Sequence, residues 1–263
     1  MNLFSFFSKK FGNASDTQDA NLPLRITMKS VITLEMNPLM LAITQGALLN
    51  VPLDNLKMRK VKAISSIVLD GLDDKKIYRV YFNDEVDDSQ RFFLQILCDK
   101  DNPHAVDEIL VCTSFTEPPA NEDDIAFFMG ENDEGLGESR YAFSRDDLTF
   151  FLPEQEVAKR LSATEEMDGV EYQRIDANED FMPAMTGVET VIFDAQGQTG
   201  CYNQIENFMA HSRALQGAIT EELIVAFWVT TSKNGEEMSL GEQRPFAEYI
   251  FAIKLEQSNI KVI

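Results

Sequence analysis

Short runs in which apolar and polar residues alternate recur along the chain, and they predict β-strands. Polar turns such as residues 70–75 and 83–89 separate several of these runs. In residues 76–82 both faces of the alternation are partly apolar, which is typical of a sheet covered on one side and partly on the other. The spacing predicts an antiparallel meander in the first half and a hairpin at the C-terminus. The predicted strands are residues 24–34, 61–69, 76–82, 90–98, 108–115, 170–176, 188–194, 223–231 and 246–255.

Helical spacing occurs in four shorter stretches. Asn121 precedes three acidic residues and predicts the start of a short helix that ends near Met129. Residues 153–167 form a second predicted helix, and residues 201–215 a third, with Ile205 and Phe208 on its apolar side. The expected fold class is therefore α+β, with a predominantly antiparallel β-sheet and a few short helices.

The N-terminus carries the fourth helical pattern and differs from the rest of the chain. Residues 1–21 are expected to be an amphipathic segment followed by a polar linker, and residues 22–263 a single acidic globular domain with a sub-boundary near 116–139. A helix this short needs an apolar surface, which the protein's own core, a partner's groove or a membrane interface could provide. We favour the partner's groove. The expected docking residues are Leu3, Phe4, Phe7 and Phe11.

Charge is distributed unevenly along the chain and changes the expected partners. The 263 residues include 23 basic and 44 acidic ones, which give a net charge of −21. Residues 117–189 hold 5 basic and 20 acidic residues, a net charge of −15. Such a surface repels phosphate backbones and excludes nucleic acid as a partner. It favours solubility, and it also fits a partner protein with a basic surface or a polyamine.

The lack of a recognisable secretion signal and the spacing of the cysteines predict a cytoplasmic location. The apolar block of residues 3–7 is shorter than the core of a secretion signal, and no apolar run is long enough to span a membrane. Peripheral membrane contact through the N-terminal segment remains open. Cys98, Cys112 and Cys201 are an odd number at irregular spacing, which favours a reducing compartment.

The patterns that carry common chemistries are missing from the sequence. Only His104 and His211 are present, and no cysteine pair has zinc-ligand spacing. An EF-hand alignment beginning at Asp176 fails, because Phe181 and Gly187 occupy the positions that need glycine and glutamate. Phosphate-binding glycine loops and a serine nucleophile elbow are also absent. The sequence therefore predicts no catalytic residue, no metal site and no cofactor.

Five short motifs are spread along the chain: Leu3-Phe4 with Lys9-Lys10, Leu22-Pro23-Leu24-Arg25, Tyr172-Gln173-Arg174, Ala210-His211-Ser212-Arg213, and Asn259-Ile260-Lys261-Val262-Ile263. Together they resemble a bacterial family of unknown function, the YjfK-like proteins. The resemblance covers most of residues 22–263, and none of its motifs contains catalytic or ligand-binding residues. It implies a genetic neighbourhood with PspA-like membrane-remodelling proteins and with ATP-grasp enzymes similar to glutathionylspermidine synthetase.

Two functions from different classes follow from these observations. The first is a non-enzymatic interaction or adaptor protein in a bacterial envelope-stress or polyamine-linked system, with a PspA-like protein as one possible partner. The second is an enzyme of unrecognised type that uses carboxylates as acid and base. A pocket that holds a carboxylate, or a histidine with a shifted pKa, would favour the enzyme. We favour the interaction protein.

Overall fold

Most of the chain folds into one large antiparallel sheet and one small one. The computed structural model describes residues 22–51, 58–82, 90–119, 121–164, 168–176, 179–195, 198–239 and 241–263. The large sheet has the strand order β12-β11-β13-β6-β5-β4-β3-β9-β10-β8-β7. Its eight central strands are β3 (Ala63–Leu69), β4 (Lys75–Tyr81), β5 (Gln90–Asp99), β6 (Val106–Glu117), β9 (Met185–Ala195), β10 (Gln198–Ala214), β11 (Thr220–Lys233) and β13 (Pro245–Lys254).

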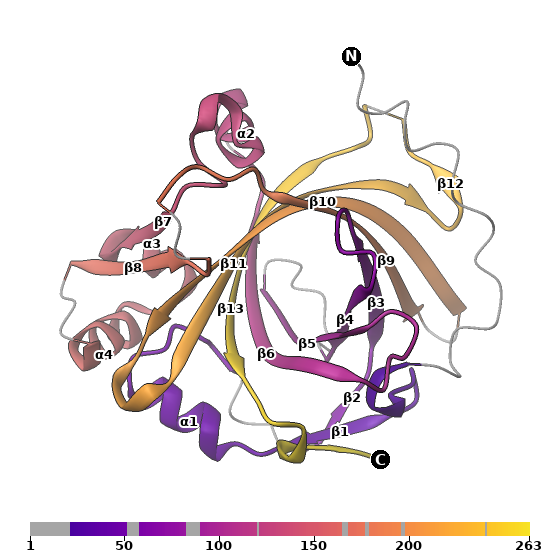
Figure 1. The fold of residues 1–263 in the computed structure, drawn as a ribbon, viewed down its shortest axis with the longest axis horizontal. Coiled ribbons are helices and arrows are strands. Elements are labelled where there is room, and N and C mark those ends of the chain that lie inside the picture. The colour runs from indigo at the N-terminus through magenta and orange to yellow at the C-terminus, as the bar shows by residue number, and fades with distance from the viewer. Residues whose placement is uncertain are drawn as a thin grey trace.

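These eight strands close into a barrel because the strands near the two ends of the series also pair with each other. β10 runs antiparallel to β11 from the pair Tyr202–Lys233 to the pair Ala214–Thr220. Figure 1 shows the eight strands arranged as a ring around the centre of the barrel. Closure removes the unpaired edges that an open sheet of this size would expose. The wall is therefore a continuous hydrogen-bonded scaffold.

Additional strands extend this barrel on the outside. β8 (Gly169–Arg174) pairs with the end of β10, and β7 (Arg140–Ser144) pairs with β8. β12 (Glu236–Glu237) pairs with β11. A separate three-stranded sheet has the order β14-β1-β2. Its strands are β1 (Val31–Leu34), β2 (Arg59–Lys60) and β14 (Ile260–Val262).

The alternation along the barrel strands divides the apolar residues into three clusters. On one outer face, the cluster that includes Tyr78 and Leu94 packs beneath the small sheet and helix α1 (Asn37–Thr44). On another outer face, a cluster around Phe251 packs beneath helices α2 (Glu122–Met129), α3 (Arg145–Phe151) and α4 (Glu154–Thr164). The third cluster, which includes Ile67 and Phe93, occupies the opposite face of the strands and fills part of the barrel interior.

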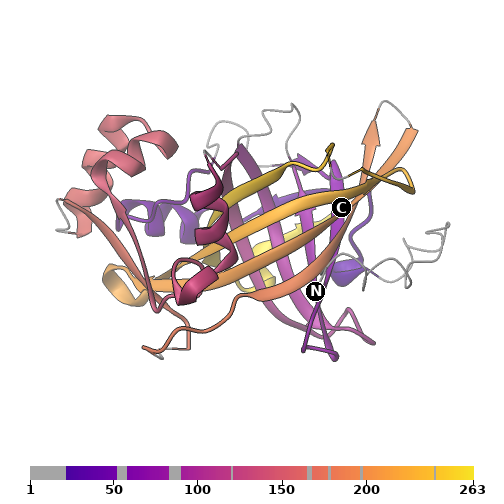
Figure 2. The same cartoon turned by 90° about the horizontal axis from the view of Figure 1, so that it is seen from above.

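The described α-helices lie toward the left of both views (Figures 1 and 2). The predicted N-cap is confirmed, since the Asn121 side chain accepts a hydrogen bond from the backbone N–H of Asp124 at 3.0 Å. Gly130 ends α2 in a left-handed conformation with φ of 67°, which glycine adopts without a Cβ penalty. The predicted helix at 153–167 is also confirmed over α4, and residues 165–167 lie outside the described residues.

Ser144 is the N-cap of α3 and forms a reciprocal capping box with Asp147. Its Oγ accepts from the Asp147 N–H at 3.2 Å, and the Asp147 carboxylate accepts from the Ser144 N–H at 2.8 Å. We expect Ser144→Ala to lower the free energy of unfolding by about 1 kcal/mol. Ser162→Ala is the control within α4, because that exposed hydroxyl bonds only the Lys159 carbonyl. Urea unfolding that shows equal losses for the two variants would contradict a capping role.

The antiparallel α+β class is confirmed, whereas two element predictions are wrong. Residues 201–215, predicted as a helix, form most of strand β10. The periodicity misled because β10 buries residues on both faces, so that adjacent residues such as Phe208 and Met209 are both apolar. Residues 24–34, predicted as one strand, contain a 3₁₀ helix at Pro23–Arg25 and only the short strand β1. Among the described residues, none of the helices is long and apolar enough to cross a membrane.

Candidate functional site

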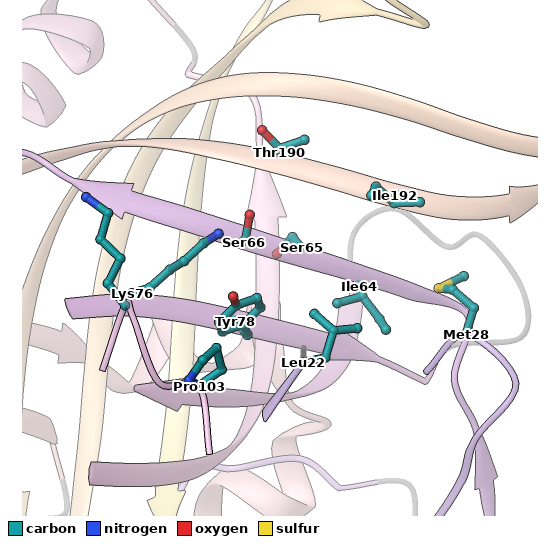
Figure 3. Close-up of a pocket in the computed structure, with 11 residues that line it drawn as sticks. Leu22, Met28, Ile64, Ser65, Ser66, Lys76, Tyr78, Pro103, Thr190 and Ile192 are labelled. Atoms are coloured by element: carbon teal, nitrogen blue, oxygen red, sulfur yellow. The ribbon is translucent and has the colours of Figure 1, made fainter. Parts of the chain in front are cut away.

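A cavity of about 220 Å³ opens on the outer wall of the barrel, across strands β9, β3 and β4. Figure 3 shows side chains of all three strands along it, with Thr190 on β9, Ser66 on β3 and Tyr78 on β4. We call this cavity the outer groove. Its full lining is Leu22, Met28, Ile64, Ser65, Ser66, Lys76, Tyr78, Lys100, Pro103, Thr190 and Ile192.

The register of the three strands sets the floor of the outer groove. Ser66 pairs with Thr190 on one side and with Tyr78 on the other, so one row across the strands carries three hydroxyl groups. The next row is apolar, because Ile64 pairs with Ile192. Alternation in each strand directs both rows to the outside of the barrel. The floor is therefore fixed by backbone pairing and not by loop conformation.

Two turns form the rim of the outer groove, and each is held by local hydrogen bonds. Met28 lies in a turn where the Thr27 N–H bonds the Ser30 hydroxyl at 3.1 Å. Lys100 begins the turn between β5 and β6, and its N–H bonds the Asp74 carbonyl at 2.9 Å. Asp99 supports the same turn by accepting from two backbone N–H groups. These hydrogen bonds place the apolar side chain of Met28 and the cationic side chain of Lys100 on the rim.

Two lysines give the outer groove a positive character within a strongly acidic protein. Lys76 is half-buried, and its Nζ lies 5.0 Å from the centre of the Tyr78 ring. Burial lowers the pKa of Lys76, an effect that the Cys98 thiol opposes and Lys100 reinforces. Its neighbour Lys75 is different, because Asp107 accepts its hydrogen bond at 2.8 Å and raises its pKa. Within the described residues, Lys76 has no carboxylate partner.

Behind the floor of the groove, the barrel interior holds a polar network. Arg79 donates to Glu206 at 3.0 Å and to Glu189 at 3.5 Å, and its Nε donates to Gln95 at 3.0 Å. The hydroxyl of Ser65 and the amide of Gln204 donate to Glu189. Burial raises the pKa of Glu206 to about 7, and the charge of Arg79 opposes this shift.

This network belongs to the interior of the barrel and not to the groove. Arg79, Glu189 and Glu206 are each at most 1% exposed. Ser65 is the one residue of the network that also lines the groove, and its hydroxyl is directed to Glu189. The carboxylates therefore cannot act on a molecule bound in the groove, and they stabilise the barrel instead.

The residues singled out in the sequence lie in different places. Leu3, Phe4, Phe7 and Phe11 are outside the described residues. Of the cysteines, Cys98 and Cys112 are buried.

The two histidines lie in different elements of the fold. His104 is exposed in the β5–β6 turn. His211 lies on β10, not on the predicted helix, and it is 1% exposed with a ring nitrogen 3.2 Å from the Glu138 carbonyl. Burial lowers the pKa of His211. Neither lines the groove. In the described part of the chain, no group of three histidine, cysteine or acidic side chains could hold a metal ion.

The outer groove is not visible in the sequence. Lys75 and Lys76 look equivalent in the sequence, and only the fold separates them, because strand alternation directs them to opposite faces. Lys100 and Met28 come from turns whose approach to β3 and β4 depends on tertiary packing. The one available signal was the alternation in residues 76–82, which places Tyr78 on the face opposite Arg79.

Comparisons of the chain with protein-family models, with curated proteins and with solved structures find no match. The resemblance to YjfK-like proteins therefore stays a prediction.

Proposed function

We propose that the protein is a non-enzymatic interaction protein, and that its outer groove binds an apolar, acidic segment of a partner protein. The lining of the groove supports this proposal, because it combines apolar side chains with two lysines and has no carboxylate, histidine or thiol. Apolar contacts would supply affinity, and the lysines would select acidic side chains. The basic partner or polyamine predicted from the charge of residues 117–189 would need a different surface.

The size of the groove favours a protein segment over a cofactor. Sites that enclose a drug-sized molecule have volumes of about 300–1,000 Å³. At about 220 Å³ the groove is smaller, so it would take one or two side chains of a longer segment. The floor is part of a closed barrel and needs little ordering on binding, which reduces the entropic cost of association.

Binding of two matched peptides tests the proposal. The first is a short fluorescent peptide that alternates leucine with aspartate, and the second has lysine in place of aspartate. We expect the acidic peptide to bind more tightly, and its affinity to fall as salt is added, because salt screens exposed charges. Fluorescence anisotropy measures both affinities. Equal or tighter binding of the lysine peptide would reject the proposal.

Two pairs of variants locate the binding site. Ser66→Trp fills the groove, whereas Val68→Trp adds the same bulk on the same strand at a position that is 45% exposed and does not line the groove. Lys100→Glu reverses a charge on the rim, and Lys29→Glu does so in the neighbouring turn. We expect Ser66→Trp to abolish binding and Lys100→Glu to weaken it about three- to tenfold. Binding that survives Ser66→Trp would place the peptide elsewhere.

A further inference from the structure

Lys76 combines three features that a nucleophilic lysine requires. Its side chain lines a cavity, it has no carboxylate partner within the described residues, and burial favours its neutral form by lowering its pKa. A neutral lysine amine has a free electron pair and can attack a carbonyl carbon. Lys75, one residue earlier, is held to Asp107 and lacks these features.

We infer that Lys76 condenses reversibly with small aldehydes or ketones that carry a carboxylate, and holds them in the outer groove as an imine. Lys100 lines the same cavity and would pair with the carboxylate of the bound compound. The cavity of about 220 Å³ has room for a compound of this size. This inference uses the same groove as the peptide proposal but does not rest on it.

The condensation needs no oxidant or reductant. The Nζ electron pair forms a bond to the carbonyl carbon, and the carbonyl π electrons move to oxygen, which takes up a proton. The resulting carbinolamine loses its hydroxyl group with a proton as one molecule of water, and a carbon–nitrogen double bond remains. Tyr78 lines the same cavity and is suited to donate a hydrogen bond to the carbonyl oxygen, because a tyrosine hydroxyl is protonated at neutral pH.

Trapping with glyoxylate tests the inference on the full chain. Glyoxylate is an aldehyde with a carboxylate, and cyanoborohydride converts its imine into a stable secondary amine that peptide mass spectrometry can locate. We expect the adduct on Lys76 to form several-fold faster than on Lys75 or on the exposed Lys29. Labelling that simply follows the exposure of the lysines would overturn the inference.

Variants and a second aldehyde separate the roles of the two lysines. Lys100→Gln should slow labelling of Lys76 by glyoxylate about two- to fivefold. It should slow labelling by the uncharged propionaldehyde less, because that aldehyde loses only the effect of Lys100 on the pKa of Lys76 and no charge partner. Equal slowing for the two aldehydes would overturn the assignment of a carboxylate-bearing ligand. Lys75→Gln is the matched control and should change neither rate.

Lys76→Arg separates this inference from the peptide proposal. The arginine keeps a positive charge in the groove but is not a comparable nucleophile, so the adduct at this position should disappear. Binding of the acidic peptide should persist, and an unchanged melting temperature would confirm that the variant folds. If other lysines of the Lys76→Arg variant were labelled by glyoxylate as strongly as Lys76 is in the natural protein, the inference would be wrong, whatever the peptide result.

Discussion

Arg79→Met is expected to lower the free energy of unfolding by roughly 3–5 kcal/mol, a large fraction of a domain's stability. In the natural protein this guanidinium faces both Glu189 and Glu206 inside the barrel, and also donates to Gln95. Methionine has a similar length, so the main change is the loss of the charge and its donors. Two buried carboxylates would then lack their cation, and burial of uncompensated charge is costly. Urea unfolding at pH 8 measures the loss.

The stability lost in Arg79→Met should be larger at high pH than at low pH. The pKa of Glu206 in the folded protein is about 7, above its ordinary value of 4.5, so the folded state holds this proton more tightly than the unfolded state. The stability from Glu206 is therefore fully present below about pH 4.5 and is lost as the pH rises through 7. Without Arg79 this pH dependence should steepen, and the loss at pH 5 should be smaller than the loss at pH 8.

Arg140→Met is the matched control for this substitution. Arg140 also pairs with a glutamate, at 3.4 Å from Glu171, but both side chains are more than half exposed. Exposed pairs contribute about 0–1 kcal/mol, so this variant should be nearly neutral. Similar losses for the two arginine variants, or a loss at Arg79 that does not change with pH, would contradict a structural role for the interior network.

Alternation of apolar and polar residues reveals the strands whose pairing partners are close in sequence. Strands β3 to β6 lie where the alternating runs predicted them, because polar residues separate them and each pairs with its neighbour in the chain. Strand β10 was missed, because it is covered on both faces and pairs with three different strands. Closure of the barrel depends on the pairing of β10 with β11. A wrong assignment of β10 therefore concealed the barrel.

The candidate site was less predictable than the fold. Arg79 was visible as a polar residue within an apolar run, but the sequence did not show that Glu189 and Glu206 would face it from distant strands. The outer groove requires two turns and three strands to meet, and none of its residues forms a local motif. Charge composition pointed to a cationic partner, whereas the lysines of the groove favour an acidic one. Local charge in a fold can thus oppose the net charge of the chain.

Glu221 and its neighbour Glu222 are expected to respond oppositely to the same substitution. The Glu221 carboxylate is fully buried and accepts hydrogen bonds from the Leu49 N–H at 3.0 Å, the Tyr172 hydroxyl at 2.8 Å and Arg213 at 2.8 Å. It also accepts from the Leu48 N–H. Glu221 thereby fixes the segment after α1 against β8, β10 and β11. Leu48 and Leu49 belong to different apolar clusters, so this one carboxylate joins two parts of the core.

Glu221→Gln should cost roughly 3–5 kcal/mol in the free energy of unfolding. The amide keeps the size of the carboxylate but removes its charge, which removes the ionic contact with the buried Arg213. The new NH₂ group would also face donors instead of acceptors, and such contacts leave buried groups unsatisfied. Urea unfolding at pH 8 measures this loss, and a loss below about 1 kcal/mol would show that the segment is held by other contacts.

Glu222→Gln is the control, and its expected effect has the opposite sign. Burial raises the pKa of Glu222 to about 7, with a further contribution from Glu108 that Lys254 opposes. Because the folded pKa lies above the unfolded value of 4.5, ionisation of Glu222 removes stability as the pH rises through 7. The glutamine variant cannot ionise, so it should be more stable than the natural protein at pH 8 by about 1–2 kcal/mol, a linkage value reduced for partial exposure to solvent. At pH 5 the two should differ little. A variant that is less stable at pH 8 would mean that the ionised Glu222 makes a favourable contact, and would reverse the sign assigned to it.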